Sequence, residues 1–191
     1  ISDIDNELII EVNNEPSFES INESYNKISE KLPDLNKNED IFFIALGGGS
    51  VIDTAKIICL MISNNTNNVH DLIKKESNKK FIEKIKIICI PTTSGTGAEI
   101  TPFSSIWDKK NGLKYSIVSD KLFRKIILDP KLTLGLPKKI IISSGIDALC
   151  QILESSWSNK ANKLSLKSSF LGYKYFSKNI NLILEDLDNI E

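Results

Sequence analysis

The chain is poor in the residues and patterns on which several classes of protein depend. Its 191 residues carry one histidine, three cysteines and a net charge of −1. No apolar run approaches the roughly 18 residues of a membrane span, and the balanced charge provides no basic field for a nucleic acid. The first residues are acidic and show no signal-peptide pattern. We therefore expect a cytoplasmic protein without membrane or nucleic-acid partners.

The scarce histidine and cysteine also argue against common catalytic and metal sites. His70 lies in a polar loop with no nucleophile motif nearby, so it does not support a Ser-His-Asp or Cys-His hydrolase. We interpret it as a surface residue rather than a metal ligand. Cys59, Cys89 and Cys150 are odd in number and embedded in apolar runs. They predict buried free thiols rather than disulfides or a zinc site.

The most informative stretch is an apolar run of strand length, residues 42–46, that ends in three glycines at 47–49. A helical pattern begins at once, with Ser50 where an N-cap is expected and Asp53 in the predicted first turn. Glycines let the backbone approach a ligand closely, and a helix N-terminus favours negative charge. The stretch predicts an anion site, and a tight turn that binds nothing is the alternative.

A second loop with special chemistry follows the apolar strand predicted over residues 85–90. It offers hydroxyls and two glycines: Thr92, Thr93, Ser94, Gly95, Thr96 and Gly97. Hydroxyls suit a ribose or a phosphate because each can donate and accept a hydrogen bond. A Ser/Thr-rich turn is the alternative for this loop alone. Two such loops after strands of a parallel sheet favour a bound dinucleotide, although neither G-x-G-x-x-G nor a P-loop is present.

Alternating patterns predict an α/β, Rossmann-like domain with a parallel sheet over residues 1–137. Strands are expected at 8–12, 42–46, 85–90 and 126–128, helices at 17–32 and 51–63, and an Asn-Gly hairpin over 103–118. Residues 138–191 carry helical spacing without a strand signal, with helices expected at 146–157 and 164–187. They predict the start of an all-helical domain, and we expect the chain to be a piece of a longer product.

Asp147 and Gln151 form a third candidate site. Asp147 is expected early in its helix, and Gln151 follows one turn later on the same face. A carboxylate and an amide oxygen so placed can hold a polar ligand or contribute to a hard-metal site. Alternatively, Asp147 only stabilises the N-terminus of its helix.

Four ordered motifs resemble those of the iron-containing (group III) alcohol dehydrogenase family. They lie at residues 47–56, 91–99, 127–130 and 145–149. The resemblance implies the dehydroquinate synthase-like architecture, in which a dinucleotide-binding domain precedes an all-helical domain. It also implies hydride transfer between NAD(H) or NADP(H) and a small aldehyde or alcohol. The residue that selects between the two cofactors would precede residue 1.

The resemblance further implies roles for single residues. Those at the cofactor would be Gly48, Gly49 and Ser50 on the pyrophosphate, Asp53 as a brace of that loop, Thr92, Thr93 and Thr96 at the diphosphate, ribose or nicotinamide, and Lys114 at the ribose. Asp147 and Gln151 would lie at the reacting end, with Asp147 matching a metal ligand. The family usually adds a histidine four residues later, where this chain has Gln151.

Glutamine is a poor ligand for Fe²⁺ or Zn²⁺ compared with imidazole. Two further ligand positions of the family would lie beyond residue 191. Either a weakened set holds a divalent metal (Fe or Zn), or hydrogen bonds polarise the carbonyl instead. We favour the absence of a tightly bound metal.

Residues 107–109 and 147–158 resemble the phosphonoacetaldehyde reductase branch of the family. This implies a small aldehyde with an anionic head, for which Arg124 and Lys114 are candidate contacts. The alternatives are a metal-dependent dehydrogenase of a simple alcohol or diol, and a nucleotide-binding chain that is catalytically incomplete. A nonoxidative relative that uses NAD is disfavoured by Gln151. The oligomeric state stays open, with a homodimer as one outcome.

Overall fold

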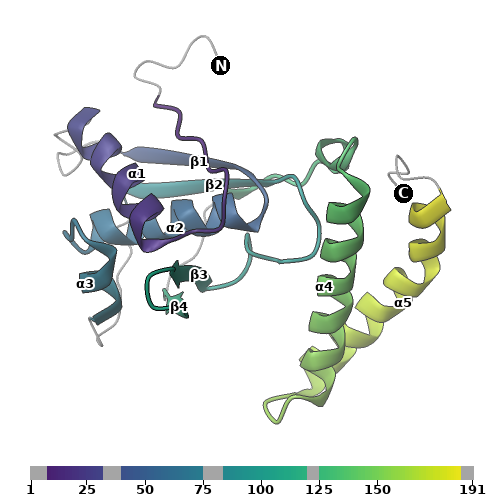
Figure 1. Ribbon diagram of the computed structural model, residues 1–191. Coiled ribbons are helices and arrows are strands. Elements are labelled where there is room, and N and C mark those ends of the chain that lie inside the picture. The colour runs from purple at the N-terminus through teal and green to yellow at the C-terminus, as the bar shows by residue number, and fades with distance from the viewer. Residues whose placement is uncertain (1–7, 32–39, 75–83, 120–124, 186–191) are drawn as a thin grey trace. The chain divides into compact units, whose positions relative to one another are not determined.

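The structure is a computed structural model that describes residues 8–31, 40–74, 84–119 and 125–185 (Figure 1). The chain divides into two compact units. The first comprises Ile1–Ile90 and Ala98–Ile127, and the second comprises Pro91–Gly97 and Leu128–Glu191. The second unit thus begins before the division predicted at residue 137, and it takes in the hydroxyl-rich loop as well as the C-terminal helices.

The first unit is built on a three-stranded sheet in the order β1-β2-β5, formed by β1 (Ile41–Gly47), β2 (Ile85–Pro91) and β5 (Lys125–Ile126). Strands β2 and β5 are parallel, with Ile88 opposite Lys125. Strands β1 and β2 begin side by side, because the Ile41 N–H donates to the Lys84 carbonyl at 2.9 Å. They therefore run in the same direction, and the predicted α/β fold with a parallel sheet is confirmed.

Three helices belong to this unit: α1 (Phe18–Lys31), α2 (Gly49–Ser63) and α3 (Val69–Lys74). Helix α2 contacts β1, α1, α3 and the strand β3 (Phe103–Asp108), so it is covered on most sides (Figure 1). Its side chains from Ile57 to Ile62 are all buried, and Ile52 is buried as well. A helix that is apolar around its circumference is expected at the centre of a core, and α2 occupies that place.

Helix α1 begins as its sequence predicts. The Ser20 N–H donates to Ser17 Oγ at 3.2 Å, and the Ser17 N–H donates to Ser20 Oγ at 2.9 Å. This reciprocal arrangement satisfies an amide at the helix start. Ile21 and Ile28 then lie seven residues apart on the buried face. By contrast, residues 8–12 form no strand in the structure, so the strand predicted there is wrong.

The predicted hairpin is confirmed. Strand β3 pairs antiparallel with β4 (Leu113–Val118), from Phe103 opposite Val118 to Asp108 opposite Leu113. The turn is closed by Asn111, whose backbone N–H and side-chain amide donate to the Asp108 carboxylate at 3.1 and 2.7 Å. The Asn111 bonds lower the pKa of Asp108. Gly112 has φ +65°, which explains the glycine after Asn111.

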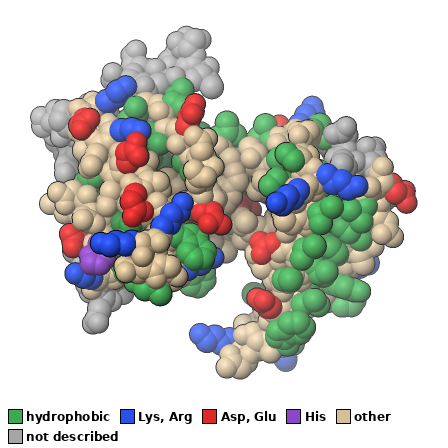
Figure 2. Space-filling view, viewed as in Figure 1, with side chains coloured by type: hydrophobic (Ala, Val, Ile, Leu, Met, Phe, Trp, Pro, Cys, Tyr) green, Lys and Arg blue, Asp and Glu red, His purple; other side chains and the backbone are tan. Residues whose placement is uncertain are grey.

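The second unit pairs α4 (Lys138–Trp157) with α5 (Lys163–Glu185), after a short 3-10 helix at Pro130–Thr133. The helices meet where Ser155 Oγ and Ser169 Oγ lie 2.6 Å apart. Gly172 gives room for Ile152, since an added Cβ would stand 3.1 Å from Ile152 Cγ1. Many hydrophobic side chains of this pair remain exposed (Figure 2), among them Trp157, Leu164, Phe170 and Tyr175.

Helix α4 begins at Lys138, earlier than the start predicted at residue 146. The predicted start follows directly on Ser143, Ser144 and Gly145, and serine is common just before a helix. In the structure both serines lie inside the helix, where their hydroxyls donate to the Ile140 and Ile141 carbonyls at 3.1 and 3.2 Å. Serine can make such bonds to its own helix as readily as it can cap one, and this explains the error.

The single histidine is a surface residue, as expected, but it lies on α3 rather than in a loop. The His70 ring meets the Phe18 ring edge-on at 6.0 Å between centroids. Cys59 and Cys89 are buried free thiols, but Cys150 is exposed, so its predicted burial is wrong. Burial raises the pKa of Cys89 to about 11. None of the described helices combines the length and apolarity needed to span a membrane.

We predict that Ser17→Ala destabilises the protein by about 1 kcal/mol, because it removes the oxygen that caps α1. Ser29→Ala is the matched control, since Ser29 Oγ only donates to the Tyr25 carbonyl within the same helix. Urea titration followed by circular dichroism measures both. Equal stability of the two variants would contradict the capping role.

Candidate active site

The glycine loop is shaped by two different constraints. Gly47 ends β1 with φ +155°, and a Cβ there would stand 2.4 Å from Val51 Cγ2. Gly48 is the N-cap of α2 and is extended, with φ −75° and ψ −173°. Its carbonyl accepts from the Val51 and Ile52 N–H groups at 3.0 and 3.2 Å. The loop is therefore a tight strand-to-helix turn that only glycine fits at residue 47.

The predicted N-cap Ser50 is wrong, because Ser50 is the second residue of α2 and the cap is Gly48. The correction brings the N–H groups of Gly49 and Ser50 into the first helical turn. A helix offers its first N–H groups no acceptor of its own. The anion site predicted at this loop therefore keeps its physical basis, with the backbone rather than the serine hydroxyl as the leading donor.

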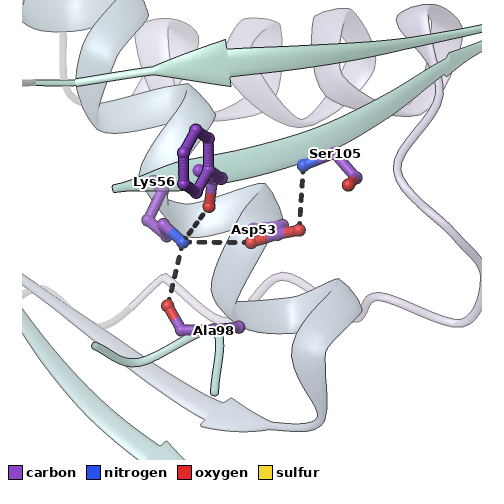
Figure 3. A network of polar contacts seen from close by, with 5 residues as sticks. Asp53, Lys56, Ala98 and Ser105 are labelled. Atoms are coloured by element: carbon purple, nitrogen blue, oxygen red, sulfur yellow. Dashed lines mark hydrogen bonds and ion pairs between the residues drawn. The ribbon is translucent and has the colours of Figure 1, made fainter. Parts of the chain in front are cut away.

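Asp53, which is partly buried, and Lys56, which is buried, form an ion pair on α2 (Figure 3). Sequence analysis placed Asp53 in the first turn of the helix, but in the structure it lies beyond that turn. One carboxylate oxygen accepts from Lys56 Nζ at 3.2 Å, and the other accepts from the Ser105 N–H at 2.9 Å. The resemblance implied a brace of the glycine loop. In the structure the Asp53 carboxylate braces strand β3.

Lys56 is 2% exposed, and its ammonium also donates to the Ala98 carbonyl at 2.9 Å and to the Phe103 carbonyl. Burial lowers the pKa of Lys56, and the Asp53 charge opposes that shift. Sequence analysis missed this residue as a site component. The available signal was a lysine on a continuously apolar helix, three residues after an aspartate, where a charge needs a partner.

The hydroxyl-rich loop over residues 91–97 packs against α4 within the second unit. Gly95 has φ +142°, and a Cβ there would stand 2.3 Å from the Ser144 carbonyl oxygen. Thr92 and Thr93 are partly exposed, and Thr96 is exposed. Ser144 precedes Asp147 by less than one helical turn. The close approach at Gly95 therefore brings the second predicted loop beside the third predicted site.

Asp147 and Gln151 lie on one exposed face of α4, as predicted, with Gln151 Nε2 donating to Asp147 Oδ2 at 3.0 Å. Asp147 is far from the first turn of a helix that starts at Lys138, so the alternative role at the helix N-terminus is wrong. Over the described ranges, no three His, Cys, Asp or Glu residues group to hold a metal. Of the ligands that Fe²⁺ or Zn²⁺ prefers, this pair supplies one carboxylate, and the Gln151 amide is a poor ligand for either ion.

Lys114 lies on β4 directly opposite Trp107, and its ammonium stands 5.5 Å from the centre of the Trp107 ring. The lysine is exposed, so a cation–π contact holds it without burying it. Arg124, the other basic residue considered for an anionic substrate, lies outside the described residues.

Comparisons with known proteins agree with these motifs. A family model described as iron-containing alcohol dehydrogenase matches residues 2–130. The chain is 34% identical over 178 residues to an alcohol dehydrogenase of Thermococcus barophilus, covering 88% of this chain and 45% of that protein. It is 29% identical over 154 residues to a phosphonoacetaldehyde reductase of Streptomyces viridochromogenes, covering 78% of this chain and 37% of that protein.

Solved structures show the same fold. An iron-containing alcohol dehydrogenase of Thermotoga maritima matches with a TM-score of 0.81 and 29% identity, over 96% of this chain and 47% of that one. A sulfoacetaldehyde reductase of Bifidobacterium kashiwanohense in complex with NAD⁺ matches with a TM-score of 0.73 and 27% identity, over 92% and 44%. The chain spans less than half the length of the relatives that it matches.

We predict that Gly95→Ala destabilises the second unit by at least about 2 kcal/mol, because the added Cβ meets a backbone oxygen and φ is unfavourable. Gly112→Ala is the matched control: its φ is also positive, at +65°, but nothing lies within 4 Å of the added Cβ. Denaturant titration measures both variants. If Gly95→Ala costs no more than Gly112→Ala, the close packing of this loop on α4 is wrong.

Proposed function

Because the chain belongs to the iron-containing alcohol dehydrogenase family, we propose that it is the cofactor-binding part of an NAD(P)H-dependent reductase of small aldehydes. The observation that carries the proposal is the arrangement of the two neighbouring strands β1 and β2. A loop follows each strand directly. Gly47 in the loop after β1 and Gly95 in the loop after β2 let the backbone approach a ligand closely. A dinucleotide binds at the carboxyl ends of such strands in this kind of sheet.

We assign the pyrophosphate to Gly48, Gly49 and Ser50. The start of α2 presents backbone N–H groups and the positive end of a fifteen-residue helix, and both favour an anion. Asp53 supports this region from a distance, since its carboxylate is engaged by Lys56 and Ser105 and adds no negative charge free to repel the phosphates.

The ribose and nicotinamide end of the cofactor falls to the hydroxyls of Thr92, Thr93 and Thr96 and to the ammonium of Lys114. The threonines follow β2 and are accessible to different extents. Among the described residues, the contact that holds the Lys114 ammonium is with the face of Trp107, so the ammonium can turn toward a ribose hydroxyl at little cost. The complex of the related sulfoacetaldehyde reductase with NAD⁺ supports the choice of cofactor.

When bound, the nicotinamide would supply a hydride to the carbonyl carbon of the aldehyde, whose oxygen would take up a proton from water. The reacting oxygen needs a hydrogen-bond donor as its negative charge develops. Gln151 has two amide N–H groups, and one of them donates to Asp147. We propose that the second N–H donates to the aldehyde oxygen, and that Asp147 fixes the orientation of the amide.

A small aldehyde with an anionic head is the substrate class that we propose. The relative named phosphonoacetaldehyde reductase and the structural relative named sulfoacetaldehyde reductase support this class. The alternative of a metal-dependent dehydrogenase of simple alcohols is supported by the match to alcohol dehydrogenases. The location that we propose is the cytoplasm, with small molecules as the ligands and a homodimer as one possible assembly.

We predict that the full-length protein oxidises NADH or NADPH with small phosphonate- or sulfonate-bearing aldehydes. In Lys114→Met the KM for the cofactor should rise by about tenfold with little change in kcat, because one charge-assisted contact is lost. Lys110→Met is the control, since Lys110 lies in the exposed hairpin turn. Initial rates at 340 nm measure these values, and no turnover across a panel of small aldehydes would refute the proposed activity.

We also predict that removal of metal by a chelator leaves the reductase activity within about twofold of the untreated protein, because Gln151 is a poor metal ligand. Elemental analysis should accompany the assay. One Fe or Zn per chain, together with loss of activity on chelation, would establish the metal-dependent alternative instead.

A further inference from the structure

Lys56 joins parts of the chain that are distant in sequence. Its ammonium lies on α2, the helix that begins at the glycine loop. The acceptors are the carbonyls of Ala98, 42 residues later, and Phe103, 47 residues later. Residues 98–103 connect the end of the hydroxyl-rich loop to the hairpin. Lys56 therefore ties the helix that begins at one predicted cofactor loop to the segment that follows the other.

Asp53 completes the connection. It accepts from Lys56 and from the Ser105 N–H, so the pair reaches both the start of β3 and its third residue (Figure 3). Residues 98–102 are irregular, with neither helix nor strand. The Ala98 carbonyl in that irregular segment, and the Phe103 carbonyl at the start of β3, accept from the ammonium rather than only from backbone groups.

Stability alone is a poor explanation for this pair. Withdrawing an ammonium and a carboxylate from water carries a large desolvation cost, and well-packed apolar side chains in their place are often at least as stable. An apolar side chain at residue 56 would fill the space but could not bind two carbonyls. The hydrogen bonds of the pair fix the positions of the two carbonyls, which apolar packing alone would define less well.

We propose that Lys56 is a positioning residue for the cofactor, which acts through the Ala98 and Phe103 carbonyls to hold the segment between the hydroxyl-rich loop and the hairpin against α2. The idea rests on the proposed function, since it concerns residues assigned there to the cofactor. Lys56 sets the distance from the start of α2 to β3 and, across the hairpin, to Lys114 on β4. With that distance fixed, one cofactor molecule contacts the start of α2 through its pyrophosphate and Lys114 through its ribose at the same time.

The first test is Lys56→Met, which keeps the length and removes the charge. The dissociation constant for NADH should rise at least about tenfold, while kcat at saturating NADH stays within about threefold. Lys86→Met is the matched control, because Lys86 pairs with Asp40 at the opposite end of the sheet and is far less buried. An affinity of Lys56→Met within about twofold of the unmodified protein would overturn the proposal.

A second variant separates positioning from stability. Lys56→Met leaves a carboxylate partly buried without its counter-ion, and this destabilises the fold. Asp53→Asn combined with Lys56→Met removes both charges, and the asparagine oxygen can still accept from Ser105. The double variant should regain thermal stability without regaining NADH affinity, because the two carbonyls are still not held. Recovery of affinity together with stability would mean that Lys56 serves the fold alone.

A third measurement does not depend on any nucleotide. Hydrogen exchange at the Ser105 amide should be at least about tenfold faster in Lys56→Met, with exchange at Ile57 in the core of α2 unchanged. If the unmodified protein binds neither NADH nor NADPH, the proposed function fails and this measurement decides the role of Lys56 by itself. Unchanged exchange at Ser105 would overturn the positioning role.

Discussion

The first unit is organised around one ion pair, between the buried Lys56 and the partly buried Asp53. Lys56 is 2% exposed, so its ammonium must have its hydrogen bonds satisfied inside the protein. It finds them on Asp53 and on two backbone carbonyls, and Asp53 in turn binds the backbone of Ser105. Helix α2, the irregular segment after the second loop and the hairpin are thereby fixed to one another. Removing either charged group would leave the other without its counter-charge, so the two residues act as a unit.

A second constraint, the absence of a Cβ, shapes both predicted cofactor loops. At Gly47 a side chain would collide with Val51 of the helix that follows, and at Gly95 it would collide with the backbone of Ser144. The glycines therefore do two things at once. They permit unusual backbone angles, and they let each loop lie directly against a helix: α2 for the first loop and α4 for the second.

Local patterns predicted α1, β2 and the hairpin because neighbouring residues determine them: the Ser17 cap, the apolar run of β2, and Asn111 with Gly112. Where the same signals have two physical uses, prediction failed. Ser50 could cap a helix but lies within one, and Ser143 and Ser144 bond to their own helix instead of starting it. Lys56 was missed for another reason. Its partners lie 42 and 47 residues away, and no local pattern contains that information.

Asp147 and Gln151 lie close together on α4, and the glutamine limits what this pair can bind. Both residues project from one face of α4, and the Gly95 contact places this helix beside the hydroxyl-rich loop. A histidine at residue 151 would present an imidazole that binds a metal well, whereas glutamine presents an amide that donates to Asp147. In the proposed reaction the donor to the aldehyde oxygen is then neutral and fixed by a carboxylate. Such a donor stabilises a developing alkoxide less than a metal ion would. The proposed role of Lys56 concerns a different step, because its hydrogen bonds position groups that bind the cofactor. Lys56 therefore matters for turnover at low cofactor concentrations, and much less when the cofactor is saturating.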